Sequence, residues 1–108
     1  MQPTDFLKAI GANGTGPVIS RGNMFGMPCW KVQSKVFAIE FQVGMVFKLP
    51  TAARQKALGT MGAQLWAPFS KRHVKKEWVY LPNASEADVI FFAHEAIRYV
   101  SQLASKTL

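Results

Sequence analysis

The residues that could carry out nucleophilic, acid–base or metal chemistry are few in this sequence and lie far apart. Cys29 is the only cysteine, and a catalytic thiol needs a nearby histidine, for which His73 is the one loop candidate. Because Cys29 lies beside Trp30 in an expected strand, we expect a buried and unreactive thiol. His94 and Glu95 lack the second histidine of the H-E-x-x-H zinc pattern, so we expect a solvated pair on a helix.

The six acidic residues are spread along the chain, and no two are placed to form a pair of catalytic carboxylates. Two histidines and one cysteine give no zinc signature and no internal disulfide. The sequence therefore predicts a protein that is not an enzyme and that binds no metal, cofactor or small-molecule substrate. An enzyme that depends on Cys29 is the least favoured alternative.

A run of basic residues between two expected strands is the best candidate for a binding surface. Four of the thirteen lysines and arginines lie in it, namely Lys71, Arg72, Lys75 and Lys76. These cations could neutralise phosphates, and unpaired bases could stack on the flanking Trp66, Phe69 and Trp78. A solvated turn is the commoner outcome for such a run, and core packing is the commoner outcome for such aromatics. The net charge of +7 suits both interpretations.

The elements that position these residues follow from periodicity and turn signals. Residues 1–23 are predicted to form a short helix over 4–10, capped by Thr4, and then a glycine-rich loop. That loop lacks the preceding strand and the following helix that a phosphate-binding loop requires. Residues 24–49 are predicted to form a meander of three antiparallel strands.

Alternation of apolar and polar residues defines this meander. Phe37, Ile39 and Phe41 recur with a period of two, which predicts that they share one buried face while the other face is wetter. Two short connections join the strands, at residues 33–35 and 42–44. Pro28 cannot donate to a strand ladder, so we expect it at an edge or at a bulge.

The second half of the chain is predicted to hold two helices and two strands. A short helix spans 51–58, with Thr51 as its cap and Gly59 as its stop. Two strands with the basic run between them occupy 63–82. A long amphipathic helix over 85–104 is expected to lie on the sheet.

The long helix carries two further signals. Its cap is either Asn83, with Glu86 three residues on, or Ser85, with Asp88 three residues on. Phe91 falls in the middle of the polar face, where an aromatic ring is solvated unless a partner or a neighbouring loop covers it. This residue is therefore a candidate interface position.

Together these patterns predict one α+β domain over residues 1–108. We expect two layers: a curved antiparallel sheet of about five strands, with an N-terminal helix, a short middle helix and a long C-terminal helix. A domain of this size removes roughly two thirds of its unfolded surface from water, so it can fold without disulfides. With no apolar run near the ~20 residues of a membrane span, and no signal-peptide pattern, a soluble cytoplasmic protein is expected.

Several short motifs converge on a known family through their order and spacing. They are Gly16-Pro17-Val18, Arg21, Met24-Phe25-Gly26, Lys35-Val36-Phe37-Ala38, Phe47-Lys48-Leu49 and Trp78-Val79-Tyr80-Leu81-Pro82. Together they resemble the TfoX/Sxy N-terminal-domain family over nearly the whole chain. The resemblance implies a two-layer α+β domain with a curved antiparallel sheet, akin to secretion-chaperone and YjbR-like folds. It implies no catalytic residues.

The family takes its name from competence regulators in which this domain is followed by a second one. Met27-Pro28 stands where the family commonly continues with another glycine, so the chain resembles a divergent, stand-alone member. We expect a protein-interaction or regulatory module that self-associates, with a sheet edge near Pro28 or the ring of Phe91 meeting the partner. The alternative is a nucleic-acid-associated regulator of transcription or competence that uses the basic residues 71–76.

Overall fold

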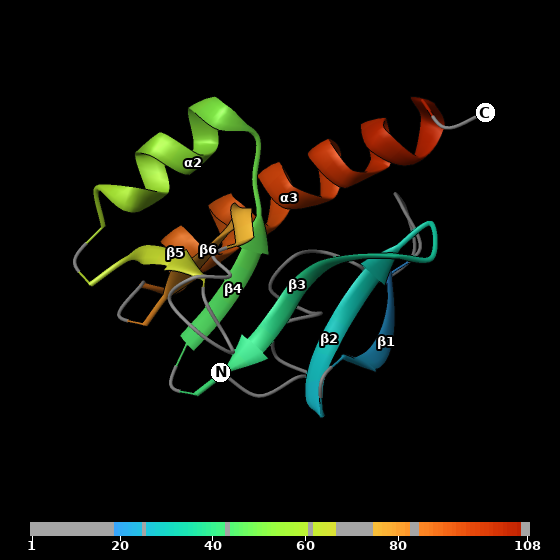
Figure 1. Ribbon diagram of the computed structural model, residues 1–108, viewed down its shortest axis with the longest axis horizontal. Coiled ribbons are helices and arrows are strands. Elements are labelled where there is room, and N and C mark those ends of the chain that lie inside the picture. The colour runs from blue at the N-terminus through green and yellow to red at the C-terminus, as the bar shows by residue number, and fades with distance from the viewer. Residues whose placement is uncertain are drawn as a thin grey trace.

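A computed structural model of the chain describes residues 19–24, 26–42, 44–60, 62–66, 75–82 and 85–106. The expected N-terminal helix and the glycine-rich loop lie outside these residues. The described elements are β1 (Ile19–Met24), β2 (Met27–Val32), β3 (Lys35–Phe41), β4 (Gly44–Lys48), α2 (Thr51–Leu58), β5 (Gln64–Trp66), β6 (Lys75–Leu81) and α3 (Glu86–Lys106) (Figure 1). The α+β class is therefore confirmed.

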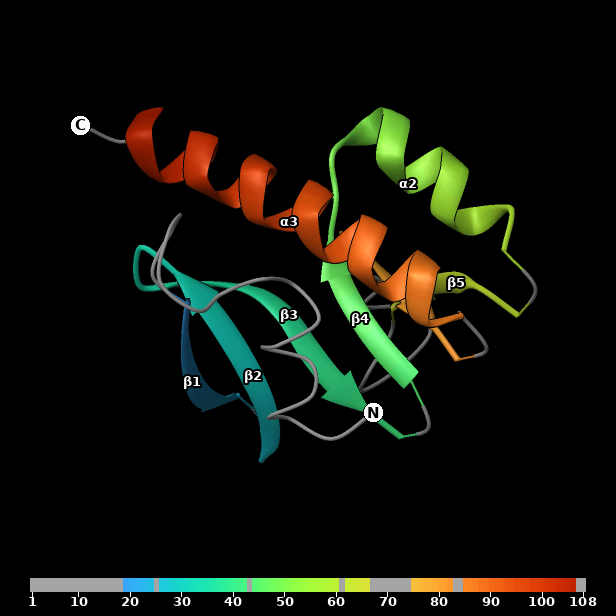
Figure 2. The ribbon, with the colours of Figure 1, turned by 180° about the vertical axis from the view of Figure 1, so that it is seen from behind.

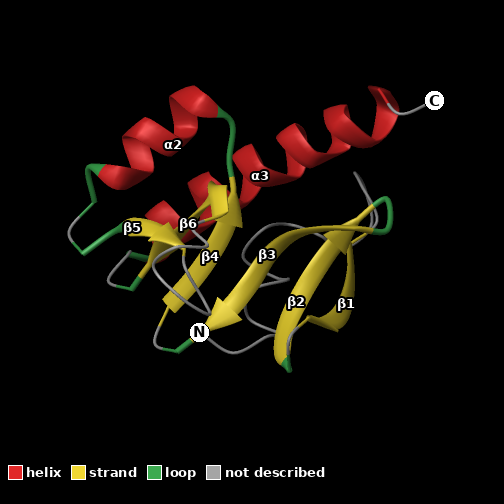
Figure 3. Ribbon diagram, in the orientation of Figure 1, coloured by secondary structure: helices red, strands yellow, loops and turns green. Residues whose placement is uncertain are grey.

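The six strands form one antiparallel sheet in the order β1-β2-β3-β4-β6-β5 (Figure 3). The strand beyond the expected number is β1, which folds back onto β2 in a hairpin that pairs Met24 with Met27. Gly26 lies in this turn with a φ of 78°, a left-handed conformation that suits glycine. One polar stretch of the sequence, ISRGNM, thus forms a strand without the alternation that marks the others.

The expectation that Pro28 lies at a sheet edge is wrong, because β1 covers that side of β2. Pro28 pairs with Asn23 in the β1–β2 ladder, directly after the pair that closes the hairpin. Hydrogen-bonded and non-hydrogen-bonded pairs alternate along such a ladder, and Asn23–Pro28 is a non-hydrogen-bonded pair. The backbone nitrogen of Pro28, which has no hydrogen to donate, therefore points toward β3. Pairing of β2 with β3 begins only at Cys29, so proline is tolerated at this point.

The two predicted hairpin connections are confirmed, although neither has a standard turn sequence. Gln33 and Ser34 have φ values of 50° and 64°, the pattern of a type I′ turn. The β3–β4 connection starts at Gln42, whose φ is 51°. After it, Gly44 runs so close to β6 that a Cβ atom there would lie 2.2 Å from the carbonyl oxygen of Leu81.

Strand β3 contains a bulge at Phe37. Trp30 on β2 lies opposite Ala38, and the next residue, Lys31, lies opposite Val36. Phe37 is therefore the extra residue between two paired ones, as in a β-bulge. The bulge turns the strand partway along its length.

The bulge changes which residues of β3 share a face. Phe37 and Ala38 are adjacent in the chain, yet both pack in the core under the helices. Ile39 and Phe41 belong to the opposite face of the sheet. The prediction that Phe37 shares a face with Ile39 and Phe41 is therefore wrong, because strict alternation stops at the bulge.

Apolar side chains are buried on both faces of the sheet, so the expectation of one wetter face is also wrong. The helix-side core joins Trp30, Val32, Phe37, Ala38, Met45, Phe47, Leu49, Val79 and Leu81 to buried residues of α2 and α3. The second face has its own core of Cys29, Ile39, Val46, Trp66 and Tyr80. Cross-strand pairs agree with this division, since Phe47 pairs with Val79 on one face and Val46 with Tyr80 on the other.

Both helices contribute to the core on the same side of the sheet, and α3 crosses β2, β3 and β4 (Figures 1 and 2). Helix α2 packs beside β6 through Ala53 and Ala57. The predicted apolar arc of α3 is buried at Val89, Phe92, Ala93, Ala96, Ile97 and Val100. In the described part of the chain, no helix is sufficiently long and apolar to span a membrane.

The helix ends confirm some of the predicted caps and correct one. The backbone N–H of Asp88 donates to Ser85 Oγ at 3.2 Å, so the second of the two expected caps is present. At the start of α2 the cap position is held by Pro50, with no side-chain hydrogen bond, and Thr51 is the first helical residue. Thr51 is therefore not the cap. Gly59 ends α2 as predicted: its N–H donates to the carbonyl of Lys56, and the N–H of Thr60 donates to the carbonyl of Ala57.

Candidate interaction surfaces

The helix layer exposes two large apolar side chains among the described residues. Phe91 is 40% exposed and Leu58 is 38% exposed. The ring of Phe91 packs edge-on against Phe92, with 5.1 Å between the ring centroids. Lys56 Nζ lies over the same ring, 4.3 Å from its centroid, within the range of a cation–π contact. We call Phe91 and the Lys56 side chain that contacts it the helix-layer patch.

The position of the patch follows from local structure. Phe91 precedes the buried Phe92 by one residue, a rotation of about 100° around the helix, so one ring enters the core and the other points outward. Lys56 and Leu58 lie in the last turn of α2, and the Lys56 contact brings this turn to the first half of α3. The expectation that Phe91 lies in the polar face is confirmed, and α2 supplies a partial cover through one lysine.

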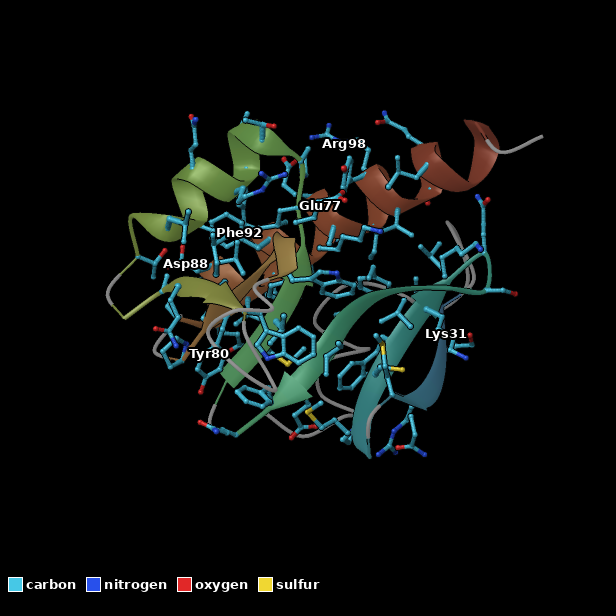
Figure 4. The ribbon with its side chains drawn as sticks, in the orientation of Figure 1. Lys31, Glu77, Tyr80, Asp88, Phe92 and Arg98 are labelled. Carbon is cyan, nitrogen blue, oxygen red and sulfur yellow. The ribbon has the colours of Figure 1, made fainter. Side chains whose placement is uncertain are left out.

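A polar cluster ties the two helices to β6. The hydroxyl of Tyr99 on α3 donates to the carboxylate of Glu77 on β6 (Figure 4). Arg54 on α2 donates to the carbonyl oxygen of Leu49 at 3.3 Å, and the N–H of Leu49 donates to the carbonyl of Glu77 at 2.8 Å. All three charged or phenolic side chains are half-buried. The cluster holds the junction of α2, β6 and α3.

The pKa of Tyr99 is raised above its ordinary value in this cluster. The hydrogen bond to Glu77 is the largest cause, followed by burial and by the negative charge of Glu77, whereas the charge of Arg54 acts in the opposite direction. A phenol that is kept protonated serves as a hydrogen-bond donor. Sequence analysis missed this cluster because its members come from three elements far apart in the chain, and none belongs to a local motif.

The second face carries a connected group of aromatic rings. Phe41 lies edge-on to Tyr80 at 5.1 Å and to Trp66 at 5.7 Å, and Trp66 lies 6.0 Å from Trp78 between ring centroids. Lys48 Nζ lies 5.9 Å from the centroid of the Trp78 ring. Trp66 is buried, whereas Trp78 and Phe41 keep part of their surface exposed. Trp66 is thus packed in the core, whereas Trp78 is packed in the core only in part.

The residues singled out from the sequence do not form one site. Lys71, Arg72 and His73 lie outside the described residues, and Lys75 and Lys76 are the first two residues of β6. Pro28 is half-buried in an inner strand.

Cys29 and the histidine–glutamate pair are separated by the sheet. The Cys29 thiol is fully buried in the second-face core. His94 is exposed on α3, and Glu95 forms an ion pair with Arg98 one turn along the same helix. Across the described ranges, no group of three or more histidine, cysteine, aspartate or glutamate side chains is placed to hold a metal ion.

The fold and these surfaces define a small α+β domain, in which the described residues form one antiparallel sheet with two helices on one side of it. No family model matches the chain, and neither a curated protein nor a solved structure matches it.

Proposed function

We propose that this chain is a non-enzymatic protein-interaction module of the TfoX N-terminal type that self-associates through the helix-layer patch. The observation that carries the proposal is the exposure of Phe91, an aromatic ring in the centre of an otherwise polar helix face. Aromatic side chains are enriched at the centres of protein interfaces, where they supply a large apolar area with few rotatable bonds.

Charges around the patch suit contact between two copies of the chain. Lys56 is a cation beside Phe91, and the first turn of α3 carries the acidic residues Glu86 and Asp88. In a two-fold interface each surface meets itself, so a patch that holds both signs of charge can pair its cation with the acids of the second copy. Such rim pairs set the orientation, while the apolar centre supplies most of the affinity.

Sedimentation equilibrium tests this proposal. The wild-type chain should form a dimer, and Phe91→Glu should raise its dissociation constant about tenfold or more, because a charge would be buried at the centre of the interface. Gln102→Glu is the matched control, since it adds the same charge at another exposed position of α3. Both variants should keep the wild-type circular dichroism spectrum.

Two outcomes would contradict self-association through the helix layer. A wild-type chain that stays monomeric at high concentration would remove the proposal. A dimer that is equally stable in Phe91→Glu and Gln102→Glu would place the interface elsewhere.

A nucleic-acid-associated regulator that uses residues 71–76 remains the alternative, and it depends on the sequence alone. An electrophoretic mobility shift with single- and double-stranded DNA tests it, and no retardation at low salt would exclude it. An enzyme that depends on Cys29 is disfavoured by the burial of the thiol.

A further inference from the structure

The described acidic residues lie on one side of the sheet. All five described acids lie on the helix side or at its border: Glu40, Glu77, Glu86, Asp88 and Glu95. Glu40 pairs with Met45 of the helix-side core, Glu77 bonds to Tyr99 of α3, and the other three are residues of α3. The second face therefore carries no acidic side chain from the described part of the chain.

Two lysines lie on the second face at the same end of the sheet. Lys31 on β2 pairs with Val36 on β3, and Lys48 on β4 pairs with Trp78 on β6. Val36 and Trp78 both pack against the second-face core, which fixes the side to which these pairs belong. Because one strand separates β2 from β4, the two lysines are about 10 Å apart across the sheet.

These pairs form a row across the second face, which we call the cationic row: Lys31, Val36, Lys48 and Trp78. All four side chains are half-buried, so each keeps a surface that a ligand can reach. Lys31 extends over β1, since a Cβ atom on Gly22 would lie 3.0 Å from its Cε (Figure 4). The Trp78 ring contacts Trp66 in a tilted arrangement, and the Lys48 ammonium lies over the Trp78 ring, 5.9 Å from its centroid.

We propose that the cationic row binds single-stranded nucleic acid. Lysines spaced across a sheet can neutralise successive phosphates, and a supported, half-exposed indole offers a face on which a base can stack. Both contacts use features that every nucleotide has, so binding is tolerant of sequence. A duplex hides its base faces and would lose the Trp78 contact. This surface is distinct from the helix-layer patch, so the two proposals stand or fall separately.

Fluorescence anisotropy with a fluorescein-labelled oligothymidylate and the full chain tests this inference. Trp78→Ala should weaken binding about 5- to 150-fold, the range expected for one lost base stack. Lys48→Gln and Lys31→Gln should each make the slope of log affinity against log salt shallower by about 0.7, the value for one phosphate contact on a single strand.

Lys35→Gln is the matched control for the lysine variants. It removes the same charge from an exposed residue whose strand partner, Val32, belongs to the helix-side core. Affinity and salt slope should stay near those of the wild type. Trp78→Leu, which keeps an apolar side chain in place, tests the loss of stacking if Trp78→Ala does not fold.

Four outcomes of the binding measurements would overturn the inference, and a fifth concerns the control variant. The four are no binding of the oligothymidylate at low salt, binding that Trp78→Leu leaves unchanged, equally tight binding of a duplex of the same length, and binding of vesicles containing anionic lipid without binding of the oligonucleotide. If Lys35→Gln and Lys48→Gln change the affinity and the salt slope equally, the binding depends on net charge alone, and this outcome would also overturn the inference.

Discussion

Single residues in this protein take their roles from neighbours that are distant in sequence. The helical periodicity of α3 gives Tyr99 no special role. In the structure, however, its hydroxyl donates a hydrogen bond to Glu77 on β6, and the positive charge of Arg54 on α2 acts on it electrostatically. The negative carboxylate accepts the phenolic proton in a hydrogen bond and disfavours the phenolate. The pKa of Tyr99 is raised for this reason, and the hydrogen bond joins α3 to β6.

Loss of this hydrogen bond should be measurable in Tyr99→Phe. The free energy of unfolding should fall by about 1 kcal/mol at neutral pH, the usual net value for one hydrogen bond. A raised pKa means that the folded state favours the protonated phenol, so this contribution is complete below the ordinary pKa of 10.0 and is lost as the pH rises through the raised value. Urea unfolding of both proteins from neutral to alkaline pH measures the difference.

Glu77→Gln is the control that separates charge from packing. It keeps a hydrogen-bond acceptor but removes the negative charge, so ultraviolet titration should show the pKa of Tyr99 moving back toward its ordinary value. A pKa that is the same in both proteins would show that burial dominates.

At the scale of elements, local sequence signals predicted the bounds of the two described helices, but they did not predict every feature of the sheet. The 51–58 helix has the predicted bounds, and the long helix begins within one residue of its predicted start. Helical periodicity and caps are encoded within a few adjacent residues, which makes them readable. The β3 bulge at Phe37 depends instead on how β3 pairs with β2, and alternation alone gives no sign of it.

The two helix starts should respond differently to loss of a hydroxyl. Ser85→Ala should lower the free energy of unfolding by about 1 kcal/mol, because the Asp88 N–H loses its acceptor. Thr51→Ala should change it by only about a few tenths of a kcal/mol, because the cap position belongs to Pro50. Denaturant unfolding of both variants measures this contrast, and equal losses would contradict the assignment of the caps.

At the scale of the whole molecule, the sheet is buried on both faces but charged unevenly. One face packs against two helices, and the other holds an aromatic and aliphatic core of its own. The described acids lie with the helices, while two lysines lie on the second face. The described acidic residues are therefore confined to one side of the sheet.

Core substitutions on opposite faces should destabilise the protein by similar amounts. Ile39→Ala on the second face and Leu49→Ala on the helix side each remove a fully buried aliphatic side chain. Each should lower the free energy of unfolding by about 2–5 kcal/mol. Urea unfolding measures both, and a loss below about 1 kcal/mol for Ile39→Ala would contradict a true second core.

The sequence by itself determined the α+β class, the order of the predicted elements from β2 onward and the outward position of Phe91, because periodicity and capping act between residues a few positions apart. The candidate sites were less readable. Trp78 was identified as an aromatic beside a basic run, but its pairing with Lys48 arises from the β4–β6 register. Tertiary structure alone decided the bulge, the inner position of Pro28, the Tyr99–Glu77 contact and the placement of the described acids on one side of the sheet, because these depend on which distant strands and helices become neighbours.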